Sequence, residues 1–251
     1  HGAGLLGAYD NGAPVAFFAH RRLREKPPWG GVSVLSESAP LDTDMKTMAK
    51  RLLAAGHDVT VYNRTRSKVE PLGELGAKIV DSPRAMRGLD IVFTTVSASD
   101  DLIAVCEGPD GLLDKSGSPK LIVDCSSVSE EASAQVRTAA AKLGTAMLAA
   151  PVSGNAKVVA AGKLTIVASG PRDSFEMAQP YLEALGQGVT YVGEGELARM
   201  VKICHNLLLG IVAQSLAEIT VLAEKGGVKR SAFLEFINNS VMGSQFSRYK
   251  T

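Results

Sequence analysis

Strand-like and helix-like segments alternate along most of this chain. Short apolar runs, many of them rich in β-branched residues, lie at 58–62, 77–80, 90–95 and 121–124, and segments with helical spacing such as Ser129–Leu143 separate them. Parallel strands need a crossover of a dozen or more residues, which is usually a helix. The alternation therefore predicts βαβ units with a parallel sheet, and an α/β, Rossmann-like domain.

The pattern changes after Gly195. Glu196–Gly226 is one long helical stretch, and Ser231–Asn238 begins another helix with Ser231 as a candidate cap. We predict an irregular segment over 1–31, a Rossmann-like domain over 32–194 and the start of an all-helical domain over 195–251. Because the chain begins at His1 rather than Met and ends soon after the second helix, we expect a fragment.

Composition excludes several classes of protein. The 251 residues carry a formal net charge of +1, which gives no electrostatic footprint for nucleic acid. The three cysteines are far apart, so we expect no disulfide framework and a reducing, cytoplasmic location. No continuous apolar run reaches the ~20 residues of a membrane span, and no His or Cys cluster indicates a metal site. We expect neither a membrane nor a metal partner.

The glycine pattern of a dinucleotide-binding turn is displaced. Gly2–Gly7 reads GxGxxG, but only His1 precedes it, so the strand that the mechanism requires is missing. The turn is instead expected between the strand Val32–Leu35 and the helix Met45–Ala55. The residues there, 36–44, contain no glycine and three carboxylates, which would repel a phosphate.

Asn63, Arg64 and Thr65 follow the strand at 58–62. In a dinucleotide fold this strand end meets the adenosine ribose, where an Arg beside a hydroxyl favours the 2′-phosphate of NADP over NAD. A polar turn that opens the next helix is the alternative.

Two further groups of polar residues are candidates for a substrate site. Ser153 and Gly154 lie in a small-residue loop whose hydroxyl and backbone suit a carboxylate; a tight structural loop is the alternative. Lys202 and Asn206 are spaced i, i+4, so both project from one helix face and can polarise an oxygen and move a proton. A solvated lysine and a surface amide are the alternative.

Taken together, the segments resemble the β-hydroxyacid dehydrogenases, the group of 3-hydroxyisobutyrate dehydrogenase, which share their fold with 6-phosphogluconate dehydrogenase and the imine reductases. The matching stretches are 48–57 (MAKRLLAAGH), 61–65 (VYNRT), 124–128 (DCSSV), 150–154 (APVSG), 162–165 (GKLT) and 202–206 (KICHN). The resemblance implies an NADP-dependent oxidoreductase, with NAD as the alternative cofactor, that acts on a small carboxylate: a β-hydroxy acid or its semialdehyde.

The resemblance also implies roles for single residues. Lys202 is the expected acid/base catalyst, and Ser153, Gly154 and Asn206 are expected to bind the substrate. The expected cofactor-binding residues are Asn63, Arg64, Thr65, Val96, Ser97 and Ser127. The family's helical domain, when complete, forms much of a homodimer contact.

Two departures from the family leave alternatives open. The glycine-free segment 36–44 and the short helical domain are compatible with an inactive member that binds no cofactor, and an imine reductase is a second alternative, although such enzymes usually lack the lysine that is Lys202 here. A shifted reading frame over Ser33–Asp42 can encode the glycine-rich string GLVGIGPIG. We therefore hypothesise a frame error upstream of Thr43, which sequencing of the gene across this segment would test.

Overall fold

The computed structural model describes residues 53, 56–96, 98–154 and 163–250, together with the backbone of β1–β5 nearer the N-terminus. Contacts divide the chain into two compact units, residues 1–202 and residues 203–251. This division falls after the boundary predicted near Gly195. The reason is that the first turn of the long helix packs into the first unit, where Ala198 and Arg199 are buried.

A parallel sheet forms the centre of the first unit. Its strands β8 (Ile91–Thr94), β9 (Leu121–Asp124) and β10 (Ala146–Ala149) pair in the order β10-β9-β8. Their pairing is parallel, as the sequence predicts. Phe93 and Ile122 belong to the buried core. Strands that are buried on both faces have the near-continuous apolar runs seen here, which explains why the sequence located them well.

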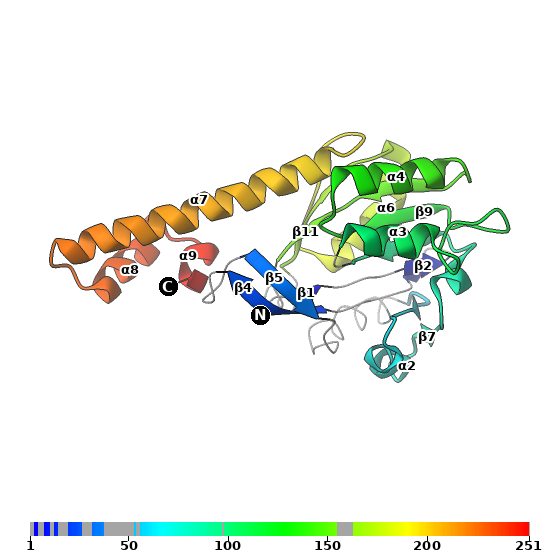
Figure 1. Cartoon of the computed structure of the whole chain (residues 1–251), viewed down its shortest axis with the longest axis horizontal. Coiled ribbons are helices and arrows are strands. Elements are labelled where there is room, and N and C mark those ends of the chain that lie inside the picture. Colours follow the sequence, from blue (N-terminus) through cyan, green and yellow to red (C-terminus); the bar gives the residue numbers. More distant parts are fainter. Residues whose placement is uncertain are drawn as a thin grey trace. The chain divides into compact units, whose positions relative to one another are not determined.

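Helices connect these strands. α3 (Ser99–Glu107) follows β8 and α4 (Glu130–Ala141) follows β9, and the two helices pack against each other (Figure 1). Ser129 caps α4, because its Oγ accepts a hydrogen bond of 3.2 Å from the backbone N–H of Ala132. This side-chain cap gives α4 the beginning that the sequence predicts.

A second, smaller sheet follows. β12 (Thr165–Ala168) and β13 (Gly188–Tyr191) are parallel and are joined by α6 (Arg172–Leu185), whereas β11 (Val152–Ser153) pairs antiparallel with β12. β12, α6 and β13 form a βαβ unit of the kind that the alternation of strands and helices predicts. β11 was not predicted, because a two-residue strand carries no periodicity that a sequence pattern can reveal.

A separate two-stranded sheet precedes the central strands in the sequence. β6 (Thr60–Val61) and β7 (Lys78–Ile79) are parallel, with η1 (Arg66–Lys68) and α2 (Glu70–Gly73) between them, and η2 (Pro83–Met86) follows. Pro71 lies in the first turn of α2, where proline is tolerated. Of the predicted helix Met45–Ala55, only Leu53 lies within the described residues.

The N-terminal strands differ from the prediction. The segment 1–31, predicted to be irregular, contains β1 (Ala3–Gly4), β2 (Ala8–Asp10), β3 (Ala13–Pro14) and β4 (His20–Lys26). β5 (Val32–Glu37) pairs antiparallel with β4 in a sheet of the order β1-β4-β5, and the strand beside β8 is β2, which is antiparallel to it.

The short stretch of sequence between β4 and β5 explains this difference. It reads PPWGG at positions 27–31, and such a Pro- and Gly-rich connection favours a local antiparallel hairpin. The expectation that Val32–Leu35 begins the parallel sheet is therefore wrong.

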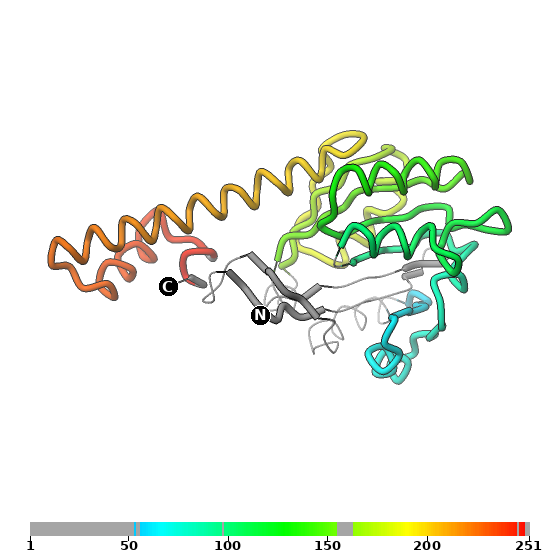
Figure 2. The backbone as a smooth tube through the Cα atoms, viewed as in Figure 1, coloured from blue at the N-terminus to red at the C-terminus, as the bar shows by residue number. Residues whose placement is uncertain are grey.

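The second unit is helical. α7 (Leu197–Lys225) begins in the first unit and continues through the second as one helix, which Figure 2 traces without a break, and α8 (Arg230–Asn239) and α9 (Gln245–Lys250) follow. The expected cap at Ser231 is wrong. α8 begins one residue earlier, at Arg230, and its N-cap residue Lys229 makes no side-chain capping bond.

Apolar side chains of α7 are widely exposed, among them Leu207 at 63% and Leu222 at 69%. Within the part of the chain that the structure describes, α7 is the helix long and apolar enough to cross a membrane, by length and composition only. Polar residues such as Gln214 interrupt the apolar residues of α7, so a search for continuous apolar runs did not reveal this helix.

The three thiols differ in their surroundings. Cys106 and Cys125 are buried and Cys204 is exposed, and all three are free. Burial raises the pKa of Cys106 and of Cys125, and the negative charge of Asp124 adds to the effect at both. We expect a thiol reagent such as DTNB to modify only Cys204 rapidly in the native protein, with Cys204→Ser abolishing that phase. Rapid labelling of a second thiol before denaturant is added would contradict this packing.

Candidate active site

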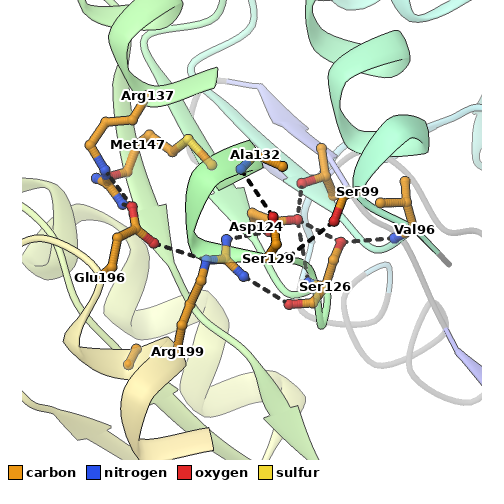
Figure 3. A network of polar contacts seen from close by, with 12 residues as sticks. Val96, Ser99, Asp124, Ser126, Ser129, Ala132, Arg137, Met147, Glu196 and Arg199 are labelled. Atoms are coloured by element: carbon orange, nitrogen blue, oxygen red, sulfur yellow. Dashed lines mark hydrogen bonds and ion pairs between the residues drawn. The ribbon is translucent and has the colours of Figure 1, made fainter. Parts of the chain in front are cut away.

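A buried polar network lies at the carboxyl ends of the central strands (Figure 3). Asp124, the last residue of β9, is fully buried. Its Oδ1 accepts hydrogen bonds from Thr94 Oγ1 at 2.7 Å and from Ser126 Oγ at 2.6 Å. Its Oδ2 accepts one from Nη2 of Arg199 at 2.6 Å. The strand ends are thus tied to the first turn of α7 through a single carboxylate.

The same network holds two loops together. The backbone N–H of Val96, after β8, donates to Ser126 Oγ, after β9, at 2.8 Å. Nη1 of Arg199 donates to the carbonyl oxygen of Ser126 at 3.1 Å. Val96 is buried, whereas the neighbouring Ser127 is exposed. Ser97 lies outside the described residues. Val96 and Ser127, two of the three cofactor residues predicted in this region, therefore belong to loops that the network fixes.

Glu196 extends the network toward α4. Its carboxylate accepts from Nε of Arg199 at 2.9 Å and from Nε of Arg137 at 2.9 Å, while Nη1 of Arg137 donates to the carbonyl oxygen of Met147. Burial alone would raise the pKa of Glu196, but the charge and hydrogen bond of Arg137, the hydroxyl of Ser133 and the charge of Arg199 together hold this pKa below its usual value. Glu196 therefore stays ionised between two guanidinium groups.

Sequence reasoning missed this network. Asp124 and Arg199 are 75 residues apart and no motif links them. The sequence did hold one signal, because Asp124 is an ionisable residue at the end of an apolar strand. A carboxylate in such a buried position requires a hydrogen-bonding or charged partner.

The predicted cofactor residues of the second region follow β6. Asn63 is buried, and its Oδ1 accepts a hydrogen bond of 2.8 Å from the backbone N–H of Thr65. Among the described residues, Asn63 Nδ2 has no hydrogen-bond partner although it is buried. Arg64 is exposed and pairs with Asp101 Oδ1 at 3.1 Å. This strand end therefore presents a buried amide with spare donor capacity beside a guanidinium, and both can bind an anion.

The predicted substrate and catalytic residues lie on other elements. Ser153 ends β11 and is half-buried, and Gly154 follows it exposed. Lys202 is half-buried, one turn after Arg199 on α7, and Asn206 is exposed one turn later on the same helix. The structure brings together the residues that follow β8 and β9, and it places Ser153 and Lys202 on separate elements of the first unit. The loop 155–162 lies outside the described residues.

The parallel strands β8, β9 and β10, their helical crossovers and the polar residues at the strand ends are typical of a dinucleotide-binding fold. Residues 45–193 match the family described as the NAD binding domain of 6-phosphogluconate dehydrogenase. The chain belongs to this family of dehydrogenases, as its resemblance to the 3-hydroxyisobutyrate dehydrogenase group implied.

Individual relatives agree with this assignment. The chain is similar to 3-hydroxyisobutyrate dehydrogenase of Pseudomonas aeruginosa, with 34% identity over 78% of this chain and 66% of the relative. It is 37% identical to the uncharacterised oxidoreductase YfjR of Bacillus subtilis, over 78% of this chain and 69% of the relative. The chain thus spans about two thirds of the length of these relatives.

A solved structure shows the same fold. Mycobacterium tuberculosis 3-hydroxyisobutyrate dehydrogenase with L-serine aligns with a TM-score of 0.71 and 26% identity, over 82% of this chain and 70% of that one.

Proposed function

We propose that this chain is an NADP-dependent oxidoreductase acting on a small β-hydroxy acid or its semialdehyde. The observation that carries the proposal is the position of Lys202 in a chain of this family. It lies half-buried, one turn after Arg199, and the guanidinium of Arg199 bonds directly to Asp124 and Ser126 of the first unit. An ammonium in partly buried surroundings is suited to proton transfer.

The residues after β6 fit the ribose end of NADP. The buried amide of Asn63 has an unused donor and Arg64 supplies a charged one, which together suit the 2′-phosphate. Thr65 adds a hydroxyl beside them. Val96, Ser97 and Ser127 are proposed to line the remaining cofactor site.

The proposed chemistry assigns one task to each residue. The nicotinamide of the cofactor, when bound, accepts the hydride in oxidation and supplies it in reduction. During oxidation the neutral amine of Lys202 accepts the hydroxyl proton while the carbinol carbon loses its hydride and the C–O bond becomes C=O. In reduction the Lys202 ammonium returns that proton. Asn206 orients the oxygen, and Ser153 with Gly154 binds the substrate carboxylate.

The names of relatives define the first substrates to test. They include 3-hydroxyisobutyrate dehydrogenase and an NAD-dependent L-serine dehydrogenase of P. aeruginosa, and both names refer to short acids with a β-hydroxyl. Oxidation of 3-hydroxyisobutyrate and L-serine, each with NADP⁺ and with NAD⁺, should be followed by the appearance of reduced nicotinamide. Turnover of neither substrate with either cofactor would contradict the proposed activity.

One specific observation favours a second candidate function. Residues 36–44 contain no glycine and three carboxylates where the family places its phosphate-binding turn. This departure favours a family member that binds no cofactor and has no activity. A cofactor titration separates the two candidates, because only the first requires saturable binding.

Arg64 should decide cofactor preference. We expect Arg64→Ala to weaken NADPH binding by about 10- to 150-fold, since a hydrogen bond to a charged group contributes roughly 1.5–3 kcal/mol. NADH binding should stay unchanged, because NADH lacks the 2′-phosphate. Fluorescence titration measures both affinities.

Arg66→Ala is the matched control, because Arg66 is also exposed and pairs with Asp81 nearby. An equal loss for NADPH and NADH, or an equal effect of the control, would contradict the assigned role of Arg64.

We further infer a cytoplasmic homodimer formed through the helical unit. The exposed apolar residues of α7 support this, since an apolar surface of this kind seldom stays uncovered in a soluble protein. Light scattering of the purified protein would test the oligomeric state.

A further inference from the structure

We propose that Arg199 is a positioning residue, which sets Lys202 in register with the two loops that follow β8 and β9. The inference rests on the role proposed for Lys202, and it adds a residue that no sequence motif indicates. Three contacts of one side chain, its burial and its place on α7 support it.

The guanidinium of Arg199 makes a different contact with each of its three nitrogens. Nη2 bonds to Asp124 at the end of β9, Nη1 to the carbonyl of Ser126 in the following loop, and Nε to Glu196 at the start of α7, at 2.6, 3.1 and 2.9 Å. A planar guanidinium whose three nitrogens are all engaged fixes both the position and the rotation of the helix turn that carries it.

Both charged groups of the Arg199–Asp124 ion pair are buried. Arg199 is 4% exposed and Asp124 is 0% exposed, so neither charge can exchange its partner for water. Replacing a buried ion pair by apolar residues is often neutral or stabilising, so stability alone is a weak reason for such a pair. A role in fixing geometry accounts better for a charged group that joins the first turn of its own helix to the end of β9 and the loop after it.

The network reaches the loops as well as the helix. Ser126 Oγ donates to Asp124 and accepts from the N–H of Val96, so the carboxylate that holds Arg199 also orders both loops. Lys202 follows Arg199 by three residues, which places both on neighbouring positions of one helix face, about 4.5 Å apart along the axis. A shift of the first turn of α7 would therefore displace Lys202 relative to the loops.

Arg199→Lys in the full chain tests the proposal, because lysine keeps the charge and loses the planar fork. The matched control is Arg87→Lys, since Arg87 is also largely buried but lies outside the network, where its Nε donates to the carbonyl oxygen of Gly111 and its guanidinium pairs with Asp114. We expect Arg199→Lys to lower kcat for 3-hydroxyisobutyrate or L-serine by about 10- to 100-fold, because small misplacements of catalytic groups have effects of this size. KM for the substrate should change little, NADPH affinity should fall because the loosened loops carry the proposed cofactor residues Val96 and Ser127, and the pH profile of kcat should shift. The control variant should leave kcat, KM, NADPH affinity and the pH profile of kcat unchanged. Unchanged kcat in Arg199→Lys, or an equal loss in the control, would overturn the proposal.

Amide hydrogen exchange provides a second test that does not require activity. We expect Arg199→Lys to accelerate exchange in peptides containing Val96 and Ser126 as well as in the first turn of α7. Acceleration confined to α7 would overturn the positioning role. Inactivity of the unmodified chain together with absent NADPH binding would instead refute the proposed function, and the exchange experiment would still decide whether Arg199 couples helix and loops.

Discussion

Lys202→Met is expected to lower kcat for oxidation of 3-hydroxyisobutyrate or L-serine by about 10²–10⁴-fold, the usual contribution of a positioned general acid or base. The variant removes the group that takes the hydroxyl proton and retains a side chain of similar length. NADPH affinity should stay within about threefold, because in the proposal Lys202 faces the substrate and a binding change of that size corresponds to well under 1.4 kcal/mol. Steady-state kinetics and fluorescence titration measure the two quantities.

Lys225→Met is the matched control, since Lys225 is an exposed lysine in the last turn of the same helix. It should leave kcat unchanged. If Lys202→Met retained the activity of the unmodified chain, the acid/base role would be wrong, and proton transfer would have to come from another group, as in the imine reductase alternative.

Asp124→Ala is expected to lower the free energy of unfolding by about 3–5 kcal/mol, because it leaves the buried Arg199 without its carboxylate partner. The substitution also removes the acceptor for Thr94 Oγ1 and Ser126 Oγ, both of which are buried. Urea denaturation followed by two independent probes measures the change and checks that unfolding remains two-state.

The control for Asp124→Ala is Asp110→Ala. Asp110 forms an ion pair of 3.9 Å with Arg84, in which both side chains are more than half exposed. Such surface pairs contribute about 0–1 kcal/mol, so the control should change the unfolding free energy very little. Equal destabilisation by the two variants would contradict the special role of the buried network.

The sequence predicts most accurately those helices and strands that depend on residues within the element itself. β9 was predicted at its observed limits because an uninterrupted apolar run over Leu121–Val123 ends at Asp124. The helix predicted over Ser129–Leu143 from its helical spacing is α4, which ends two residues earlier, at Ala141. β11 and α9 were missed because short elements carry little periodicity. The N-terminal strands were wrong because the sequence pattern gives strand propensity but not the partner with which a strand such as β5 pairs.

The residues of the candidate site likewise differ in how well the sequence predicts their positions. Asn63, Arg64 and Thr65 were placed correctly at a strand end, since their position depends only on where β6 stops. The contact between Asp124 and Arg199 depends on the fold bringing distant segments together, and no spacing rule expresses it. The family resemblance supplied roles for single residues but gave no information on this network.

Titration of the purified chain with NADPH tests the central claim most directly. Quenching of protein fluorescence or calorimetry should show saturable binding, weaker for NADH than for NADPH, and Arg64→Ala should remove that difference. Absence of saturable binding of either nucleotide in a cooperatively folded sample would contradict the account. The chain would then be a member of the dehydrogenase family that has lost its cofactor.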